Sequence, residues 1–265
     1  MAAPNLDPVT SQSSTAADVR AAVLGHADPH RAEQTARFFR TGPGEYGEGD
    51  VFVGVAVPVL RTIAAAHADL PLTDLRDLLD DAEHEHRFTA LAVMTEAYKR
   101  ALRPRTRDDA RCHALHASYL DALDGGGVDN WDLVDLSAPW LIGEHVRVHG
   151  RVDGDRVLDD LWGAEDLWRR RAGIVATLAH LRAGDAGPTH RAVLAVLDDR
   201  RPLVQKAAGW MLRESGSKVS SAGLLDFLHE HAGAMGRTAL TVATEKLDPT
   251  TRARLRALRP EPPVS

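Results

Sequence analysis

Apolar residues recur three and four positions apart in blocks along this chain, while alternating runs of β-branched residues are nearly absent. That spacing places the apolar side chains on one face of an α-helix. Examples are residues 73–81 with a threonine cap, residues 88–100 and residues 168–181. Proline and glycine residues separate the blocks. The pattern predicts an all-α fold of roughly a dozen helices joined by short turns.

Three blocks resemble one another, with polar or basic residues followed by a small residue and an apolar run. They are residues 86–94, 169–178 and 204–212. Ala172 and Ala207 are 35 residues apart, and two-helix repeats such as HEAT have periods of about 30 to 45 residues. We therefore expect a curved α-solenoid of HEAT-like two-helix repeats.

The length of 265 residues allows either two domains or one elongated repeat array, and the repeats favour the array. Residues 1–16 are rich in Ser, Thr, Ala and Pro and are expected to be a disordered leader. Residues 17–258 would form a single repeat domain, and residues 259–265 a flexible tail.

The chain has one cysteine, Cys112, which excludes an intramolecular disulfide and a cysteine-based zinc cage. The N-terminus lacks the features of a signal peptide, and no apolar run is long enough to span a membrane. Thirteen histidines form no recognised zinc pattern. We expect a cytoplasmic monomer without metal or other cofactor. The closest groupings are His84 with His86, Cys112 with His113 and His116, and His145 with His149.

The formal net charge of −6 argues against a nucleic-acid partner, but the charge is unevenly distributed. Residues 168–218 hold ten basic and four acidic residues, whereas residues 66–96 hold two basic and eight acidic residues. One interpretation is a solvated, highly charged surface. The other is a basic concave face suited to phosphate binding on an otherwise acidic body.

The segment 130–135 places Trp131 and Asp135 four residues apart, so on a helix they share a face. A carboxylate beside a large aromatic face suits a cationic centre, such as an oxocarbenium ion at an anomeric carbon. An amphipathic helix with a buried Trp and an exposed Asp gives the same pattern, so the motif alone leaves both readings open. Further candidates at equivalent repeat positions are Arg171, Lys206 and Trp210.

The glycine-rich stretch 42–49 lacks the Gly-Lys-Ser/Thr ending of a nucleotide-binding loop and precedes no strand pattern. It is expected to be a flexible loop or a turn between helices. Tyr46 within it is a candidate for contact with a ligand.

Together these motifs form an ordered set that resembles the AlkD-like DNA alkylation-repair glycosylases, over about residues 30 to 250. The residues that carry the resemblance are Arg37-Phe38-Phe39, residues 41–50, Asn130-Trp131-Asp132, Val134-Asp135, Arg170-Arg171-Ala172, Gln205-Lys206-Ala207, Gly209-Trp210, Leu212-Arg213-Glu214 and Arg237-Thr238-Ala239-Leu240.

The resemblance implies a HEAT-like fold whose concave face cradles duplex DNA and hydrolyses the N-glycosidic bond of N3- or N7-alkylated purines, with the damaged base left facing solvent rather than flipped into a pocket. Asp135 then corresponds to the catalytic carboxylate, Trp131 and Trp210 to two indoles that hold the sugar and backbone, and Arg171 to a phosphate contact. Phe38 would line the cleft. Further DNA contacts are expected from Lys206, Arg213, Arg237 and Tyr46.

An alkylated purine carries a positive charge and is already an activated leaving group, so a carboxylate and aromatic faces suffice without a general acid. The chain departs from the family pattern at Pro202-Leu203, where relatives carry bulkier aromatics. This departure is compatible with a self-resistance glycosylase that removes bulky natural-product adducts. A non-catalytic HEAT-repeat scaffold that binds protein or DNA is the remaining alternative.

Overall fold

The computed structural model describes residues 14–150 and 154–258, and these form helices and connecting loops with no β-strand apart from one isolated bridge between Val51 and Glu83. The all-α prediction is confirmed. In the first half of the chain the helices are α1 (Ala16–Leu24), α2 (Pro29–Phe38), α3 (Val57–Ala66), α4 (Leu72–Leu79), α5 (His84–Ala101), the short 3-10 helix η1 (Pro104–Thr106), α6 (Asp109–Asp124), α7 (Trp131–Ala138), the π-helical segment η2 (Pro139–Glu144) and α8 (His145–His149). In the second half they are α9 (Gly154–Gly163), α10 (Leu167–Ala176), α11 (Leu178–Arg182), α12 (Gly187–Ala195), α13 (Pro202–Lys218), α14 (Ser221–His231), α15 (Arg237–Ala243) and α16 (Pro249–Ala257).

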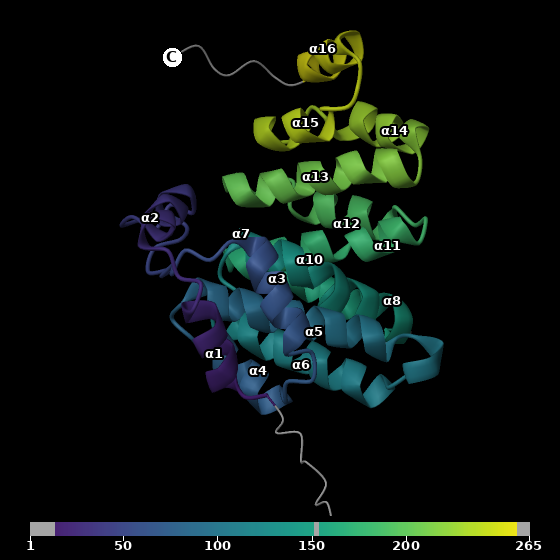
Figure 1. Cartoon of the computed structure of the whole chain (residues 1–265). Helices are drawn as coiled ribbons and strands as arrows, with labels where there is room; N and C mark the ends of the chain where they lie inside the picture. The colour runs from purple at the N-terminus through teal and green to yellow at the C-terminus, as the bar shows by residue number, and fades with distance from the viewer. Residues whose placement is uncertain (1–13, 151–153, 259–265) are drawn as a thin grey trace, which may run out of the picture.

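The helices stack in successive layers, as a solenoid-like array requires (Figure 1). Helix α5 packs on α7, α7 on α10, α10 on α13, and α13 on α15. Two of the three similar sequence blocks fall within α5 and α13, and the third begins in α10 and ends at the first residue of α11. Because each helix buries one face against the next layer, neighbouring repeats complete each other's core.

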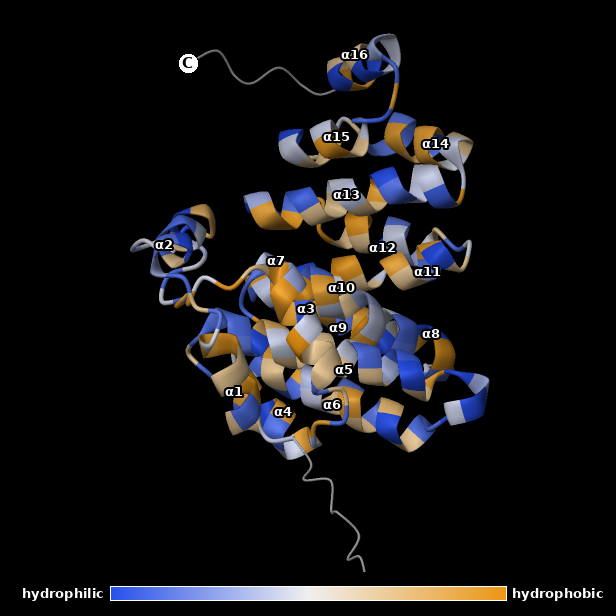
Figure 2. Ribbon diagram, in the orientation of Figure 1, coloured by the Kyte–Doolittle hydropathy of each residue, from blue (hydrophilic) through white to orange (hydrophobic). Residues whose placement is uncertain are grey.

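Buried apolar residues form one continuous cluster from Ala16 in α1 to Leu255 in α16. Figure 2 shows the hydrophobic residues concentrated around α3, α7 and α10, whereas α2 and α16 are largely hydrophilic. Helix α2 stands beside the stack, near the N-terminal end of α13 (Figure 1). Helix α2 has no buried residue, so its position relative to the stack is set by contacts of its C-terminal end and of the loop that follows it.

Two helix boundaries differ from the sequence prediction for local reasons. Helix α4 begins at Leu72 with Pro71 at the N-cap and no side-chain cap, so the predicted threonine cap is wrong. The expected helix over residues 168–181 is divided into α10 and α11 at Thr177, whose hydroxyl donates to the Ile174 carbonyl. Such a side-chain bond competes with the helical backbone pattern and permits a bend.

The predicted leader, residues 1–16, and the predicted tail, residues 259–265, lie mostly outside the residues that the structure describes. Helix α1 begins at Ala16 with Thr15 as a capping box, so the first helix starts one residue inside the predicted leader. Residues 1–13 and the predicted tail 259–265 lie outside the described residues. The boundaries of the single repeat domain stay a prediction.

Candidate functional site

A largely buried ion pair joins α7 to α10 near the middle of the array. Arg171 Nη2 donates to both carboxylate oxygens of Asp135, at 2.9 Å to Oδ1 and 2.8 Å to Oδ2, and Nε donates to Oδ1 at 3.1 Å. Its Nη1 donates to the Leu203 carbonyl at 2.6 Å. The Arg171 side chain is 6% exposed and that of Asp135 is 20% exposed. A planar guanidinium held on three sides therefore fixes the carboxylate in one orientation.

Two opposing effects act on the Asp135 carboxyl. Burial raises its pKa above the usual value, because a buried charge loses hydration, while the charge and hydrogen bonds of Arg171 lower it. The negative charge of Asp132, one turn away, adds to the raising effect. The result is an anion that depends on Arg171 for stability and keeps part of its surface open to a ligand.

Aromatic rings form a wall beside this ion pair. The Trp131 indole, at the first residue of α7, stacks on Phe39 with centroids 5.2 Å apart and planes inclined by 12°. Phe38 meets both rings edge-on, at 6.0 Å from Trp131 and 5.2 Å from Phe39. Phe38 is 65% exposed and Phe39 is buried. The exposed Phe38 ring, supported by the buried Phe39 and the half-buried Trp131, is available to contact a ligand without loss of the core.

The wall opens into a cleft of about 730 Å³ between the end of α2, the glycine-rich loop, α7, α10 and α13. Its lining residues are Phe38, Arg40, Tyr46, Trp131, Leu167, Arg171, Arg201, Pro202, Leu203 and Lys206. The structure thus brings together five of the residues predicted from sequence. Tyr46 reaches the cleft because its hydroxyl donates to the Phe38 carbonyl at 3.4 Å.

Four of the predicted residues lie outside this cleft. Asp135 lines a neighbouring cleft and meets the first one through Arg171. Trp210, one turn after Lys206 in α13, is half-buried against the core. Arg213 forms an ion pair with Glu245, and Arg237 lines a separate depression beside α16. Sequence reasoning missed two further lining residues, Arg40 and Arg201, of which Arg201 is paired with Asp199.

A buried histidine below the aromatic wall was also missed as a site residue. His84, the first residue of α5, contacts Asp50 Oδ2 through Nδ1 and Asp132 Oδ2 through Nε2, both at 2.8 Å. Burial opposes a charged imidazole, but the two carboxylates outweigh it and raise the pKa of His84 to about 9. Its ring stacks on Phe52 at 4.5 Å. His84 is therefore a cation that ties the start of α7, next to Trp131, to α5.

Two further contacts strengthen this junction. Arg87 donates to Asp50 and to Asp129, each at 2.5 Å. Asn130, the N-cap of α7, donates from Nδ2 to Asp50 at 2.8 Å. No local sequence motif indicates this network, because the two partners of each hydrogen bond are 34 to 80 residues apart in the sequence.

Glu85 anchors the loop that follows α2. Its buried carboxylate accepts hydrogen bonds from the backbone N–H groups of Val53, Gly54 and Val55. Gly54 has φ of +83°, and a Cβ there would lie 2.1 Å from the Asp28 carbonyl oxygen. Only glycine fits this close approach. The loop that follows α2 is thus fixed at its C-terminal end by α5 and by the N-cap of α2.

Ion pairs offset part of the positive charge of the segment 168–218. Acids from outside the segment contribute, since Asp124 pairs with Arg169 and Glu245 with Arg213. Asp199 bridges Arg170 and Arg201. Lys206 is exposed and, among the described residues, has no ion-pair partner. The excess positive charge of this segment is therefore smaller than the local charge balance suggests, and a basic concave face stays a prediction.

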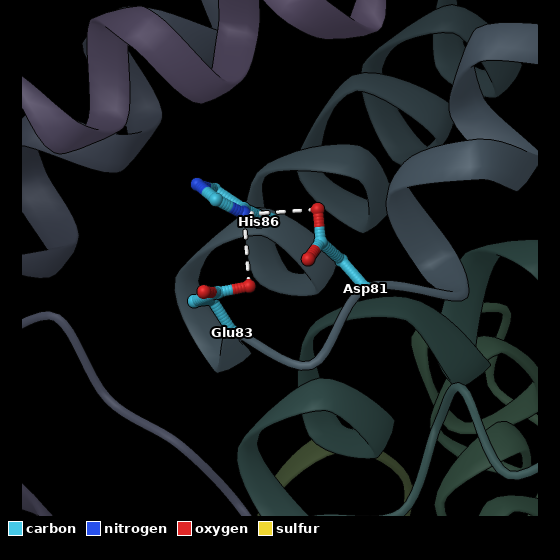
Figure 3. Close-up of side chains that lie close together, drawn as sticks. All are labelled: Asp81, Glu83 and His86. Carbon is cyan, nitrogen blue, oxygen red and sulfur yellow. Dashed lines mark hydrogen bonds and ion pairs between the residues drawn. The ribbon is translucent and has the colours of Figure 1, made fainter.

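Among the described residues, one set of three potential metal ligands has its ligand atoms within 4.8 Å of one another: Asp81, Glu83 and His86. His86 Nδ1 lies 3.0 Å from Asp81 and 3.7 Å from Glu83 (Figure 3). Arg20 Nε also donates to Asp81 at 2.6 Å. Since arginine already supplies positive charge to this group, it carries no metal assignment.

The predicted groupings of histidines after residue 112 merge into one cluster between α6, η2 and α8. The His116 and His145 rings stack at 3.9 Å, and His113 and His149 each lie within 5 Å of His145. Burial, followed by the neighbouring imidazoles, lowers the pKa of His145 to about 3. His145 is therefore neutral at pH 7, and the four rings pack against one another between the helices.

None of the described helices is both long and apolar enough to cross a bilayer.

Comparisons with known proteins agree with this architecture. The family model described as DNA alkylation repair enzyme matches residues 19–247. A solved structure titled "Predicted DNA alkylation repair enzyme from Enterococcus faecalis" is similar with a TM-score of 0.63 and 17% identity, over 84% of this chain and 98% of that chain. No curated protein matches the chain. Because the family model spans both the aromatic wall and the Asp135–Arg171 pair, the chain belongs to the DNA alkylation repair enzyme family.

Proposed function

We propose that this protein is a DNA glycosylase that hydrolyses the N-glycosidic bond of cationic N3- or N7-alkylated purines in duplex DNA. Membership of the family supports a role in DNA repair. The observation that carries the proposal is the partly exposed Asp135 carboxylate, which is held by Arg171, a residue that lines the first cleft together with the aromatic wall.

The chemistry follows from the charge of the lesion. As the C1′–N bond breaks, the base leaves with the bonding electron pair and becomes neutral, while positive charge develops on the deoxyribose. Asp135 stabilises this oxocarbenium ion and orients a water molecule that adds to C1′ and loses a proton. Because the leaving base needs no protonation, the scheme requires no general acid, metal or other cofactor.

The aromatic and basic residues of the first cleft would hold the DNA. Phe38 and Trp131 offer apolar faces to the sugar and to the cationic base, while Lys206 and Arg201 would contact phosphates. Trp210, Arg213, Arg237 and Tyr46 are further proposed contacts. In this scheme the protein acts as a cytoplasmic monomer and leaves the base facing solvent, so no closed base pocket is needed.

A second candidate keeps the chemistry and changes the lesion. Pro202 and Leu203 line the first cleft of about 730 Å³, and aliphatic side chains at these positions occupy less space than the bulkier aromatics that the family resemblance implies. This favours a glycosylase that removes bulky adducts, such as those left by DNA-alkylating natural products. A comparison of release rates from duplexes with a methyl or a bulky N3 or N7 adduct distinguishes the two.

The test of the proposal is release of base from alkylated duplex. Purified protein is incubated with a duplex that carries N7-methylguanine or N3-methyladenine, and free base and abasic sites are measured. We expect both products in equal amounts. A blank assay with methyl and bulky adducts alike, despite DNA binding, would support the non-catalytic scaffold instead.

A further inference from the structure

A second cleft lies on the other side of the Asp135 carboxylate. It has a volume of about 420 Å³ and is formed by α3, α5, α7 and the start of η2. Its polar and aromatic lining residues are Arg61, Thr95, Glu96, Lys99, Asp135 and Trp140. Asp135 thus faces this cleft, while its partner Arg171 faces the first. A strand of DNA that contacts Asp135 would pass along both.

Two cations converge on one indole ring at this cleft. Lys99 Nζ lies 4.6 Å and Arg182 Cζ 5.2 Å from the ring centroid of Trp140. Lys99 also pairs with Glu96 at 2.7 Å. An anion bound beside Trp140 would therefore meet cationic groups at the edge of an aromatic face.

Arg61 adds a further positive charge at the opposite wall of the cleft. It is exposed and, within the part of the chain that the structure describes, neither Arg61 nor Arg182 has an ion-pair partner. Among the residues that line the cleft, Arg171 balances Asp135 and Glu96 balances Lys99, so Arg61 leaves an excess positive charge of about one. Arg182 adds a cation beside Trp140, although Glu144 and Glu214 lie near enough to act on its charge.

A polar atom without a partner lies at the floor of the cleft. Thr95 is 2% exposed, and its hydroxyl has no hydrogen-bond partner among the described residues. Thr89, on the same helix, bonds instead to the carbonyl four residues earlier. A buried hydroxyl without a partner costs about 1–3 kcal/mol, so an oxygen bound in the cleft, directly or through water, would remove that cost.

We propose that this second cleft binds a phosphodiester of the DNA backbone, adjacent to the nucleotide at Asp135, with Arg61 and Lys99 as its cationic contacts and Trp140 as the apolar wall. The inference rests on the proposed binding of duplex DNA. Phosphate oxygens match the two cations and the hydroxyl, and the indole offers a face to the neighbouring deoxyribose. The lining excludes a purely apolar ligand, because three of its side chains are charged groups other than Asp135.

The experiment measures the affinity for an unmodified duplex by fluorescence anisotropy at several salt concentrations. The variants are Arg61→Gln and Lys99→Gln, and the control is Arg105→Gln, an exposed residue of η1 that is not among the lining residues of either cleft. Each phosphate contact contributes about 0.9 to the slope of log K against log salt. We expect Arg61→Gln and Lys99→Gln each to lower the slope by about one and to weaken binding at low salt several-fold. Arg105→Gln should match the wild type.

The outcomes separate this inference from the proposed chemistry. If wild-type protein binds duplex and Arg61→Gln keeps the full slope, the second cleft does not bind phosphate, and the glycosylase proposal is unaffected. If wild-type protein releases no base but Arg61→Gln lowers the slope, the cleft assignment stands and the proposed reaction fails. Because Arg61 is exposed and forms no ion pair with any residue in 14–150 or 154–258, the variant is expected to fold.

Discussion

Replacing His84 with Gln removes the cation that joins Asp50 to Asp132. The pKa of His84 is raised from 6.5 to about 9 in the folded protein. A raised pKa stabilises the fold when the group is protonated, so the contribution is full below pH 6.5 and is lost as the pH rises through 9. A shift of this size corresponds to about 3 kcal/mol.

The assay is urea unfolding of wild type and His84→Gln at about pH 6 and about pH 9.5. We expect the free energy of unfolding of the wild type to fall by about 3 kcal/mol more than that of the variant between these two conditions. At the lower pH the variant should also be the less stable protein, because Asp50 and Asp132 lose their shared partner. An equal pH dependence for both proteins would show that His84 is not charged in the fold and would refute the reasoning.

Three further predictions concern packing, acid stability and the aromatic wall. Gly209→Ala should destabilise the protein by about 1–3 kcal/mol in urea unfolding, because the new Cβ would lie 2.4 Å from the Ala239 carbonyl oxygen; an unchanged midpoint would contradict the close α13–α15 contact. Because the pKa of His145 is about 3 in the fold and 6.5 in the unfolded chain, the unfolded chain binds a proton at this residue as the pH falls below 6.5, while the folded protein does not. The free energy of unfolding of the wild type should therefore fall by about 3 kcal/mol between pH 7 and about pH 4.5. His145→Gln should reduce that fall, and an equal loss in both proteins would count against the histidine cluster. Phe38→Ala should leave unfolding unchanged, since the ring is 65% exposed, but weaken duplex binding about tenfold through lost stacking; full binding would remove Phe38 from the site.

Much of the fold follows from the sequence because helical packing is encoded locally. The spacing of apolar residues predicts α5, α10 and α13, and the repeat spacing predicts their stacking. The division of residues 168–181 at Thr177 was not predicted, because it depends on where one hydroxyl finds an acceptor. A threonine in an apolar run gives no sign of that choice.

The candidate site is only partly readable from sequence. The shared face of Trp131 and Asp135 follows from helical periodicity. In the structure Trp131 is part of the aromatic wall, and Asp135 is paired with Arg171. His84 could not be identified in this way, because its two carboxylate partners lie 34 and 48 residues away. The charge balance of residues 168–218 likewise could not predict ion pairs with acids from other segments, such as the pair of Arg169 with Asp124.

The central claim is that Asp135 supports departure of the cationic base. The most direct measurement is the single-turnover rate of N7-methylguanine release from duplex DNA by wild type, Asp135→Asn and the control Asp226→Asn, an exposed residue of α14. Asp135→Asn should release base at least about 100-fold more slowly, because it lacks the charge that stabilises the oxocarbenium ion, while duplex affinity stays close to that of the wild type. Asp226→Asn should match the wild type. Release by Asp135→Asn at the wild-type rate would contradict the account.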